Sequence, residues 1–150
     1  DLYRLLRITS PDSLFMGQKD FQQFSIIRKL ITDFQMPIQL VMCPTVREAN
    51  GLAMSSRNVR LSPEARDKAG VIFNILTSGK MLFEQKTPAK YVQDIALDAL
   101  RKVNFDPEYF EVVNGYTLEP VEHMEDAEQI VACCAVKVEG VRLIDNMIWK

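Results

Sequence analysis

The sequence predicts an α/β fold, in which a parallel strand–helix–strand unit precedes a small α+β domain with an antiparallel sheet. In the first part, the apolar segment Ser13–Met16 is followed by a helical pattern and then by a second apolar run, Ile38–Cys43. A crossover of this length joins parallel strands. In the second part, two long apolar runs are joined by Glu139-Gly140, and such a two-residue connection indicates a β-hairpin.

The parallel unit is preceded by a helical pattern in DLYRLLRI, and Ser10-Pro11-Asp12 marks the turn that follows. From Phe21 an apolar stripe recurs at helical spacing until Pro37 closes the helix. The stripe comprises Phe24, Ile27, Leu30, Ile31 and Phe34. The run IQLVMC that follows shows no apolar–polar alternation, so we expect a strand that is covered on both faces.

The sequence changes character after Asn58, and we expect two domains, residues 1–60 and 61–150. Ser62-Pro63-Glu64 has the composition of a helix start. The buried face of that helix is predicted to hold Ala69, Ile72, Phe73 and Leu76, with Ser78-Gly79 near its end. Thr87-Pro88 starts another helix, whose stripe is Val92, Ile95, Ala96, Ala99 and Val103. The predicted strands are Tyr109–Gly115, Gln129–Val138 and Val141–Trp149.

Composition and charge exclude several classes of protein. The 150 residues are 47% hydrophobic and 25% charged, with a net charge of -2, so disorder and a general attraction to nucleic acid or membrane are not expected. No apolar run approaches the roughly 20 residues that span a bilayer. Cys43, Cys133 and Cys134 lie in apolar runs without a disulfide framework, which favours reduced thiols and a cytoplasmic location. The single histidine, His123, sits in an acidic loop, and no metal site is expected.

The segment Gly17-Gln18-Lys19-Asp20 follows the first predicted strand. Ligands of open α/β sheets bind beyond the carboxyl ends of the strands. The start of a helix there offers unpaired N–H groups to an anion, and Lys19 adds a positive charge. These residues also fit an ordinary strand-to-helix turn with Asp20 as its N-cap.

The loop PTVREANGLAMSSRN follows the second predicted strand, at the same expected edge of the sheet. Met54, Ser55, Ser56 and Arg57 combine hydroxyl and amide donors with a permanent cation, which suits the phosphates of a nucleotide. The loop is neither a Walker loop nor a GxGxxG turn, and an ordinary polar loop has the same composition. We expect Arg47 and Glu48 to form an ion pair or to support the loop, and not to act as catalysts.

The chain closely resembles the pantothenate synthetase (pantoate–β-alanine ligase) family in three blocks: FMGQKDFQQFSIIRKL, PTVREANGLAMSSRNVRLSPEAR and RLIDNM. The resemblance covers essentially all 150 residues. It implies the end of a Rossmann-like nucleotidyl-transferase sheet followed by a lid-like C-terminal domain. That fold is similar to the one of class I aminoacyl-tRNA synthetases, and the SSR loop resembles their KMSKS loop.

The resemblance implies an ATP-dependent acid–amino-acid ligase that uses Mg²⁺. In such an enzyme, pantoate reacts with ATP to give a pantoyl adenylate and pyrophosphate, and β-alanine then displaces AMP to give pantothenate. The implied partners are these small molecules, without nucleic acid or membrane, and the intact protein is expected to be a homodimer. Another adenylate-forming ligase or nucleotidyltransferase of this fold is an alternative, as is a non-catalytic assembly module.

The resemblance assigns roles to individual positions. Gly17, Gln18, Lys19 and Asp20 match the family's GEKD nucleotide contact, and Gln23 matches its pantoate-binding glutamine. Val46 matches a backbone contact to adenine, and Met54, Ser55, Ser56 and Arg57 match the ATP-closing loop. Lys19, Ser55, Ser56 and Arg57 are the implied catalytic residues.

The sequence departs from the family's pattern in three ways. Gln18 stands where the family usually has glutamate, and Asn50 where it usually has aspartate. The family's HIGH-like histidine motif lies upstream of the residues in this chain. We therefore expect the chain to be the C-terminal half of a synthetase and to be inactive alone.

Overall fold

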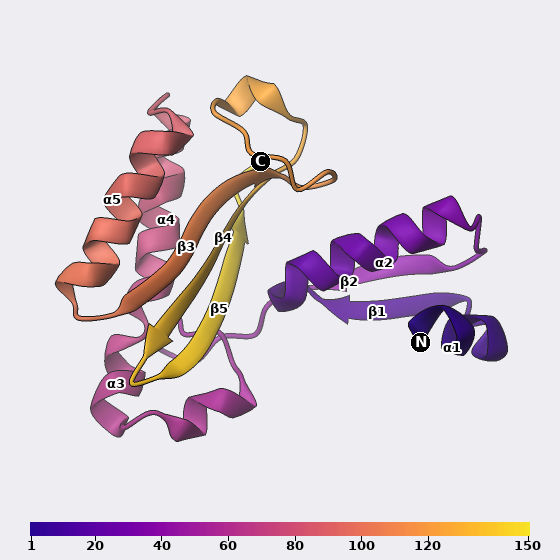
Figure 1. The fold of residues 1–150 in the computed structure, drawn as a ribbon, viewed down its shortest axis with the longest axis horizontal. Helices are drawn as coiled ribbons and strands as arrows, with labels where there is room; N and C mark the ends of the chain where they lie inside the picture. The colour runs from indigo at the N-terminus through magenta and orange to yellow at the C-terminus, as the bar shows by residue number, and fades with distance from the viewer. The chain divides into compact units, whose positions relative to one another are not determined.

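A computed structural model describes residues 1–150, which fold as two compact units, Asp1–Thr45 and Val46–Lys150 (Figure 1). The two units divide earlier in the chain than the domain boundary expected after residue 60. The reason lies in residues 46–60, whose side chains bond to later elements: Arg47 pairs with Asp145, and Glu48 pairs with Arg66. These residues therefore fold with the second unit.

The first unit has the predicted strand–helix–strand order. Its elements are α1 (Leu2–Thr9), β1 (Ser13–Gly17), the 3-10 helix η1 (Gln18–Asp20), α2 (Phe21–Asp33) and β2 (Gln39–Cys43). The two strands are parallel, with Ser13 opposite Gln39 and Gly17 opposite Cys43. Helix α2 runs alongside this sheet (Figure 1), and Phe21, Phe24 and Ile27 form its buried face. The parallel unit is therefore confirmed.

The first unit buries less of its apolar pattern than the sequence suggests, and the expectation that its second strand is covered on both faces is wrong. Phe34 follows the end of α2 and is 56% exposed, and its ring lies 4.6 Å from that of Tyr3. Strand β2 is not covered on both faces, because Gln39 is exposed and residues 40–43 are only partly buried. The sheet consists of β1 and β2 alone, so one side of β2 has no strand beside it.

The second unit packs helices against an antiparallel sheet. Its elements are η2 (Ser56–Arg60), α3 (Pro63–Lys68), α4 (Val71–Glu84), α5 (Ala89–Lys102), β3 (Asp106–Asn114), η3 (Met124–Asp126), β4 (Ile130–Val138) and β5 (Val141–Ile148). The sheet order is β3-β4-β5, with both pairs antiparallel. Helices α4 and α5 lie side by side over one face of the sheet (Figure 1), and the core lies between them.

The predicted hairpin and helix start are confirmed in the second unit. Glu139 and Gly140 both have positive φ, 49° and 74°, as the tight turn between two antiparallel strands requires. The hydroxyl of Ser62 accepts a hydrogen bond from the Ala65 amide at the start of α3. Both features depend on residues close together in the chain.

The helix expected from Ser62 onward is divided into α3 and α4. The loop at Asn50 causes the break, because its amide group donates to the Arg66 and Asp67 carbonyls at the end of α3, at 3.0 Å each. The loop also comes so close to Gly70 that an added Cβ would lie 2.5 Å from the Asn50 carbonyl oxygen. A glycine is therefore required between the two helices.

The predicted buried faces of these helices need three corrections. Gly79 lies inside α4 and packs against Trp149 instead of ending the helix. Phe73 is half-buried. Ile95 is 52% exposed, and Leu100, which is fully buried, holds the position on α5 that the prediction omitted. The last two differences follow from the actual phase of each helix against the sheet.

Candidate functional site

The residues that follow β1 leave open space at the strand's carboxyl end. Gly17 is exposed and an added Cβ would meet no atom within 4 Å. Its φ of -69° is ordinary for any residue, so the backbone conformation does not require glycine here. A glycine at this point lets a ligand approach the backbone closely. The amides of η1 and the start of α2 follow immediately in the chain.

Asp20 precedes α2 without capping it. It occupies the N-cap position, but its side chain makes no capping hydrogen bond with the helix. The ordinary-turn interpretation therefore lacks the bond that would explain an aspartate at this position. Asp20 and Gln23 are both exposed, whereas Gln18 and Lys19 are half-buried. The structure thus presents Asp20 and Gln23 on the surface near the carboxyl end of β1.

The loop that begins the second unit is a short antiparallel turn. The Met54 amide donates to the Val46 carbonyl at 2.9 Å, and the Glu48 amide donates to the Leu52 carbonyl at 2.8 Å. At the tip, Gly51 has a φ of 94°, a conformation that favours glycine. Val46 and Met54, at the two ends of the turn, are 66% and 53% exposed. Two apolar side chains of the candidate site are therefore open to solvent together.

The residues Ser55–Arg57 lead from this turn into η2. The Ser55 hydroxyl oxygen accepts a hydrogen bond from the Arg57 amide at 3.2 Å, which leaves its own O–H available as a donor. The Arg57 guanidinium is exposed and donates to the Arg142 carbonyl of β5 at 3.3 Å. Ser56 is exposed as well. Hydroxyl donors and a cation are thus grouped in one turn of backbone.

The buried side-chain amide of Asn58 stabilises the same loop. The Asn58 side chain is only 1% exposed, and its amide donates to the Glu48 carboxylate at 2.9 Å and to the Ala53 carbonyl at 3.1 Å. Arg66 donates to both oxygens of Glu48. The hydrogen bonds from Arg66, which have the largest effect, and from Asn58 hold the pKa of Glu48 below its ordinary value. Glu48 is therefore a support of the loop, as expected.

Arg47 forms an ion pair as well, but with Asp145, far along the chain, and not with Glu48. The guanidinium donates two hydrogen bonds to the Asp145 carboxylate of β5, at 2.6 and 3.0 Å. Asp145 and Asn58 are not among the residues that the sequence patterns predict for this site. The signal for Asp145 was a carboxylate within the apolar run VRLIDNMIW, because a charge in a buried strand needs a partner.

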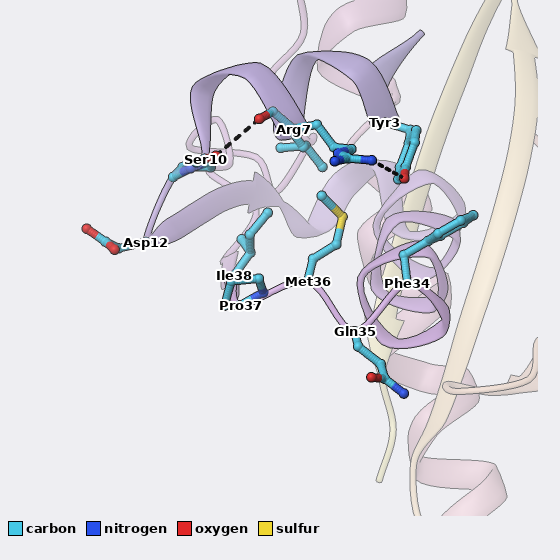
Figure 2. Close-up of a pocket in the computed structure, with 11 residues that line it drawn as sticks. Tyr3, Arg7, Ser10, Asp12, Phe34, Gln35, Met36, Pro37 and Ile38 are labelled. Atoms are coloured by element: carbon cyan, nitrogen blue, oxygen red, sulfur yellow. Dashed lines mark hydrogen bonds between the residues drawn. The ribbon is translucent and has the colours of Figure 1, made fainter.

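A cavity of about 560 Å³ lies in the first unit, lined in part by Tyr3, Arg7, Ser10 and Phe34 (Figure 2). Its lining also includes Asp12 and Ile38, the residues that directly precede β1 and β2. The cavity is therefore at the amino ends of the two parallel strands. None of the candidate residues Gly17–Asp20 lines it. It lies at the opposite end of the strands from the edge where ligands of such sheets bind.

The cysteines and acidic residues form no metal site. All three cysteines are free thiols, and Cys133 and Cys134 are buried while Cys43 is half-buried. Burial raises the pKa of Cys133 to about 12. No group of three or more His, Cys, Asp or Glu side chains could hold a metal ion. None of the helices is both long enough and apolar enough to cross a membrane.

Comparison with known proteins identifies the family. The family model for pantoate-beta-alanine ligase matches residues 2–148. This chain belongs to the pantoate–β-alanine ligase family. It is 38% identical over 150 residues to the pantothenate synthetase of Azobacteroides pseudotrichonymphae. It is 40% identical over 147 residues to that of Acetivibrio thermocellus, and each match covers 97% of this chain and 52% of the relative.

Solved structures of pantoate–β-alanine ligases have the same fold. The pantothenate synthetase of Thermus thermophilus superposes with a TM-score of 0.88 at 34% identity, over 99% of this chain and 53% of that one. The ligase of Francisella tularensis, complexed with β-γ ATP and β-alanine, superposes with a TM-score of 0.68 at 26% identity, over 99% and 48%. The predicted fold class is confirmed. The chain spans about half the length of the relatives that it matches.

Family membership does not by itself assign the individual residues. Within the second unit, Val46 and Met54–Arg57 are brought together in one short segment. Within the first unit, Gly17–Asp20 and Gln23 lie around the start of α2. The binding roles of both groups stay predictions.

Proposed function

We propose that this chain contributes to the ATP-dependent condensation of pantoate with β-alanine, which proceeds through a pantoyl adenylate. The observation that carries the proposal is membership of the pantoate–β-alanine ligase family, together with a loop whose hydroxyls and cation are grouped at Ser55–Arg57. A family relative has been solved with an ATP analogue and β-alanine bound, which supports ATP and β-alanine as substrates here.

In the first chemical step, a carboxylate oxygen of pantoate attacks the α-phosphorus of ATP. A new phosphorus–oxygen bond forms and the bond to the β-phosphate breaks, so that pyrophosphate leaves. In the second step, the amine of β-alanine attacks the carbonyl carbon of the adenylate, and AMP leaves as the amide forms. The amine loses a proton in this step. Both steps build up charge that a protein stabilises by preorganised donors.

The loop Met54–Arg57 is proposed to bind the phosphates. The planar guanidinium of Arg57 can donate two parallel hydrogen bonds to phosphate oxygens. Ser55 can donate its O–H while its oxygen keeps the bond from the Arg57 amide. Val46 would contact the adenine through its backbone, as the resemblance implies, and the exposed side chain of Met54 offers apolar contact to the purine ring.

The residues around the start of α2 are proposed, on the family resemblance, to bind phosphate and pantoate. The backbone at Gly17 has open space for the approach of a phosphate, and Lys19 would add positive charge. Gln23 would hydrogen-bond pantoate and orient its carboxylate towards the α-phosphorus. This positioning would account for much of the rate, because a phosphoryl transfer needs little covalent help from the protein.

The residues present fit a magnesium ion that arrives with the nucleotide. Magnesium commonly binds through substrate phosphates, several waters and one or two carboxylates, without a dedicated protein cage. Asp20, exposed and free of a capping bond, is the carboxylate placed to approach such an ion. The ion would neutralise part of the charge on the phosphates. We further propose a cytoplasmic location and a homodimeric intact enzyme, the latter on the family resemblance alone.

A titration of the isotope-labelled chain with magnesium-ATP tests the proposal. We expect backbone amide shifts confined to Gly17–Asp20, Val46 and Met54–Arg57. A folded spectrum without shifts at any of these residues would contradict a nucleotide site in this chain. Magnesium with AMP serves as the control, because AMP lacks the β- and γ-phosphates that Arg57 is proposed to bind.

An exchange assay tests the activity of the 150 residues by themselves. We expect no pantoate-dependent exchange between ATP and pyrophosphate, because the resemblance places the HIGH-like histidine motif outside these residues. Clear exchange by the purified chain would show that the residues described here are sufficient for adenylate formation.

A further inference from the structure

Arg47 joins three segments of the second unit. Its guanidinium donates two hydrogen bonds to the Asp145 carboxylate of β5, at 2.6 and 3.0 Å. It also donates to the Gly51 carbonyl of its own loop at 3.1 Å and to the Asn146 carbonyl at 3.4 Å. The guanidinium carbon lies 4.2 Å from the centre of the Phe73 ring in α4. One side chain therefore fixes the loop to both the sheet and a helix.

The ion pair is largely shielded from water. The side chains of Arg47 and Asp145 are 18% and 4% exposed. Each carboxylate oxygen accepts a bond from Arg47, and one oxygen also accepts from the Asn146 amide at 2.8 Å. The guanidinium donates two hydrogen bonds to the two oxygens of one carboxylate, and a single ammonium group cannot reproduce this bidentate geometry. A lysine would keep the charge but lose the two-pronged contact.

The Phe73 ring holds the tip of the loop as well. An added Cβ on Gly51 would lie 2.7 Å from the Phe73 ring, so the backbone at Gly51 rests directly on it. The same ring thus contacts both the Arg47 guanidinium and the turn that Arg47 bonds. The position of the loop depends on this stack together with the ion pair.

The ends of the turn are the residues proposed to bind the nucleotide. Arg47 is adjacent to Val46 and pairs across the turn with Ala53, which is adjacent to Met54. Arg57 is a second link to β5, through the Arg142 carbonyl, but Arg57 must give up that bond if it turns to a phosphate. The link through Arg47 does not conflict with nucleotide binding. It would hold the loop while Arg57 changes partners.

We propose that Arg47 is a positioning residue for the adenylate-forming reaction, acting through its ion pair with Asp145. The pair holds the segment Val46–Met54 on β5 and so keeps Val46 and Met54–Arg57 in the arrangement that binds ATP. This inference rests on the proposed function, because it assumes that this loop binds the nucleotide. Arg47 itself needs no contact with ATP.

Removing Arg47 alone leaves a buried carboxylate without its partner, and such a variant can fail to fold for that reason. The informative variant is therefore the double substitution Arg47→Met with Asp145→Asn, which removes both charges and keeps the volume similar. Arg47→Lys tests the two-pronged geometry separately. Arg101→Met is the control for the arginine-to-methionine replacement itself, which it makes at an exposed position on α5.

Two readouts are measured on each labelled variant. The first is hydrogen exchange at the Glu48 and Met54 amides, which report the turn, compared with amides of the central strand β4. The second is the magnesium-ATP affinity obtained from the amide shifts of Met54–Arg57. A merely structural role of Arg47 would speed exchange in the turn and in β4 alike. A positioning role speeds it in the turn alone.

In the double variant, we expect hydrogen exchange at the Met54 amide to be at least about tenfold faster than in the native chain, with exchange in β4 unchanged. We also expect magnesium-ATP to bind about tenfold more weakly, which is equivalent to about 1.4 kcal/mol. Arg47→Lys should lie between it and the native chain, and Arg101→Met should match the native chain. The inference would be overturned if, in the double variant, the exchange rates of the turn amides and the magnesium-ATP affinity stayed within about twofold of the native values. It would also be overturned if the amides of β4 lost as much protection as those of the turn.

Failure of the proposed function gives a different result. If the native chain shows no shifts with magnesium-ATP, the nucleotide site is contradicted whatever the variants do. The exchange at Met54 still decides whether the Arg47–Asp145 pair holds the turn. An intact turn in the double variant would then overturn the positioning role independently of ATP.

Discussion

The guanidinium of Arg57 donates a hydrogen bond to the backbone carbonyl of Arg142, at 3.3 Å. The acceptor is a neutral carbonyl at the start of β5, and the Arg57 side chain is exposed. An exposed bond of this length contributes little net stability, because water competes for both the donor and the acceptor. A phosphate would be a stronger acceptor for the same cation. Arg57 is therefore placed to exchange a weak partner for a nucleotide at small energetic cost.

The first prediction follows from this exchange. Arg57→Ala should weaken magnesium-ATP binding by about ten- to a hundredfold, since a hydrogen bond to a charged group contributes about 1.5–3 kcal/mol. The melting temperature should change little, because the side chain is exposed. Arg60→Ala is the matched control, as Arg60 is an exposed cation in the same 3-10 helix. Calorimetry of both variants would show equal losses if only the general positive charge of η2 attracted ATP.

The second prediction concerns acid pH and the Glu48 carboxylate. The bonds from Arg66 and Asn58 hold its pKa below the ordinary range. A carboxyl group whose pKa is lowered by folding stabilises the folded state above its unfolded pKa of about 4.3. That stabilisation is lost as the pH falls through the lowered value. We expect the loop to stay ordered at pH 5 and to loosen well below pH 4.

The substitution Glu48→Gln isolates this effect from other acidic groups, because Glu108 and Asp126 also have lowered pKa values. The variant should be less stable near neutral pH by about 1 kcal/mol, a modest loss because Arg66 is partly exposed. The difference from the native chain in urea unfolding should shrink as the pH is lowered towards 3. A difference that stays constant with pH would show that the charge of Glu48 does not act as described.

The third prediction separates the three thiols. Burial raises the pKa of Cys133 to about 12 and raises that of Cys134 as well, and both side chains are inaccessible. Cys43 is half-buried. Native chain treated with iodoacetamide near pH 8 should therefore carry one modification, at Cys43, while denatured chain carries three. Peptide mass spectrometry would contradict the described packing of β4 if Cys133 reacted as fast as Cys43.

The features that the sequence predicted well depend on neighbours in the chain. The Ser62 cap involves a hydroxyl and an amide three positions apart, and the Glu139-Gly140 turn depends on two adjacent residues. The groups Gly17–Asp20 and Met54–Arg57 were likewise found as short motifs, and their binding roles stay predictions. Local patterns such as these are informative because the energies that decide them are themselves local.

The features that the sequence did not reveal depend on distant contacts. The break between α3 and α4 arises because Asn50 approaches Gly70 and bonds the last carbonyls of α3. The partner of Arg47 lies 98 positions away. Helical periodicity cannot report either contact, since it records only which face of a helix is apolar. The pattern of the candidate site was therefore predictable, whereas the bonds that hold it were not.

The last prediction concerns Gly79, which lies in the interior of α4. In an ordinary exposed helix, replacing glycine by alanine stabilises by about 1 kcal/mol. Here an added Cβ would lie 2.9 Å from the Trp149 ring and 3.2 Å from a Val92 methyl group. Trp149 is itself packed between Phe83 and Phe110, with ring centres 5.4 and 6.2 Å away. The ring has little freedom to move, and overpacking such a site costs about 1–3 kcal/mol.

Gly79→Ala should therefore destabilise the second unit by about 1 kcal/mol in urea unfolding. A gain in stability would mean that Trp149 can shift, because the helix propensity of alanine would then outweigh the clash.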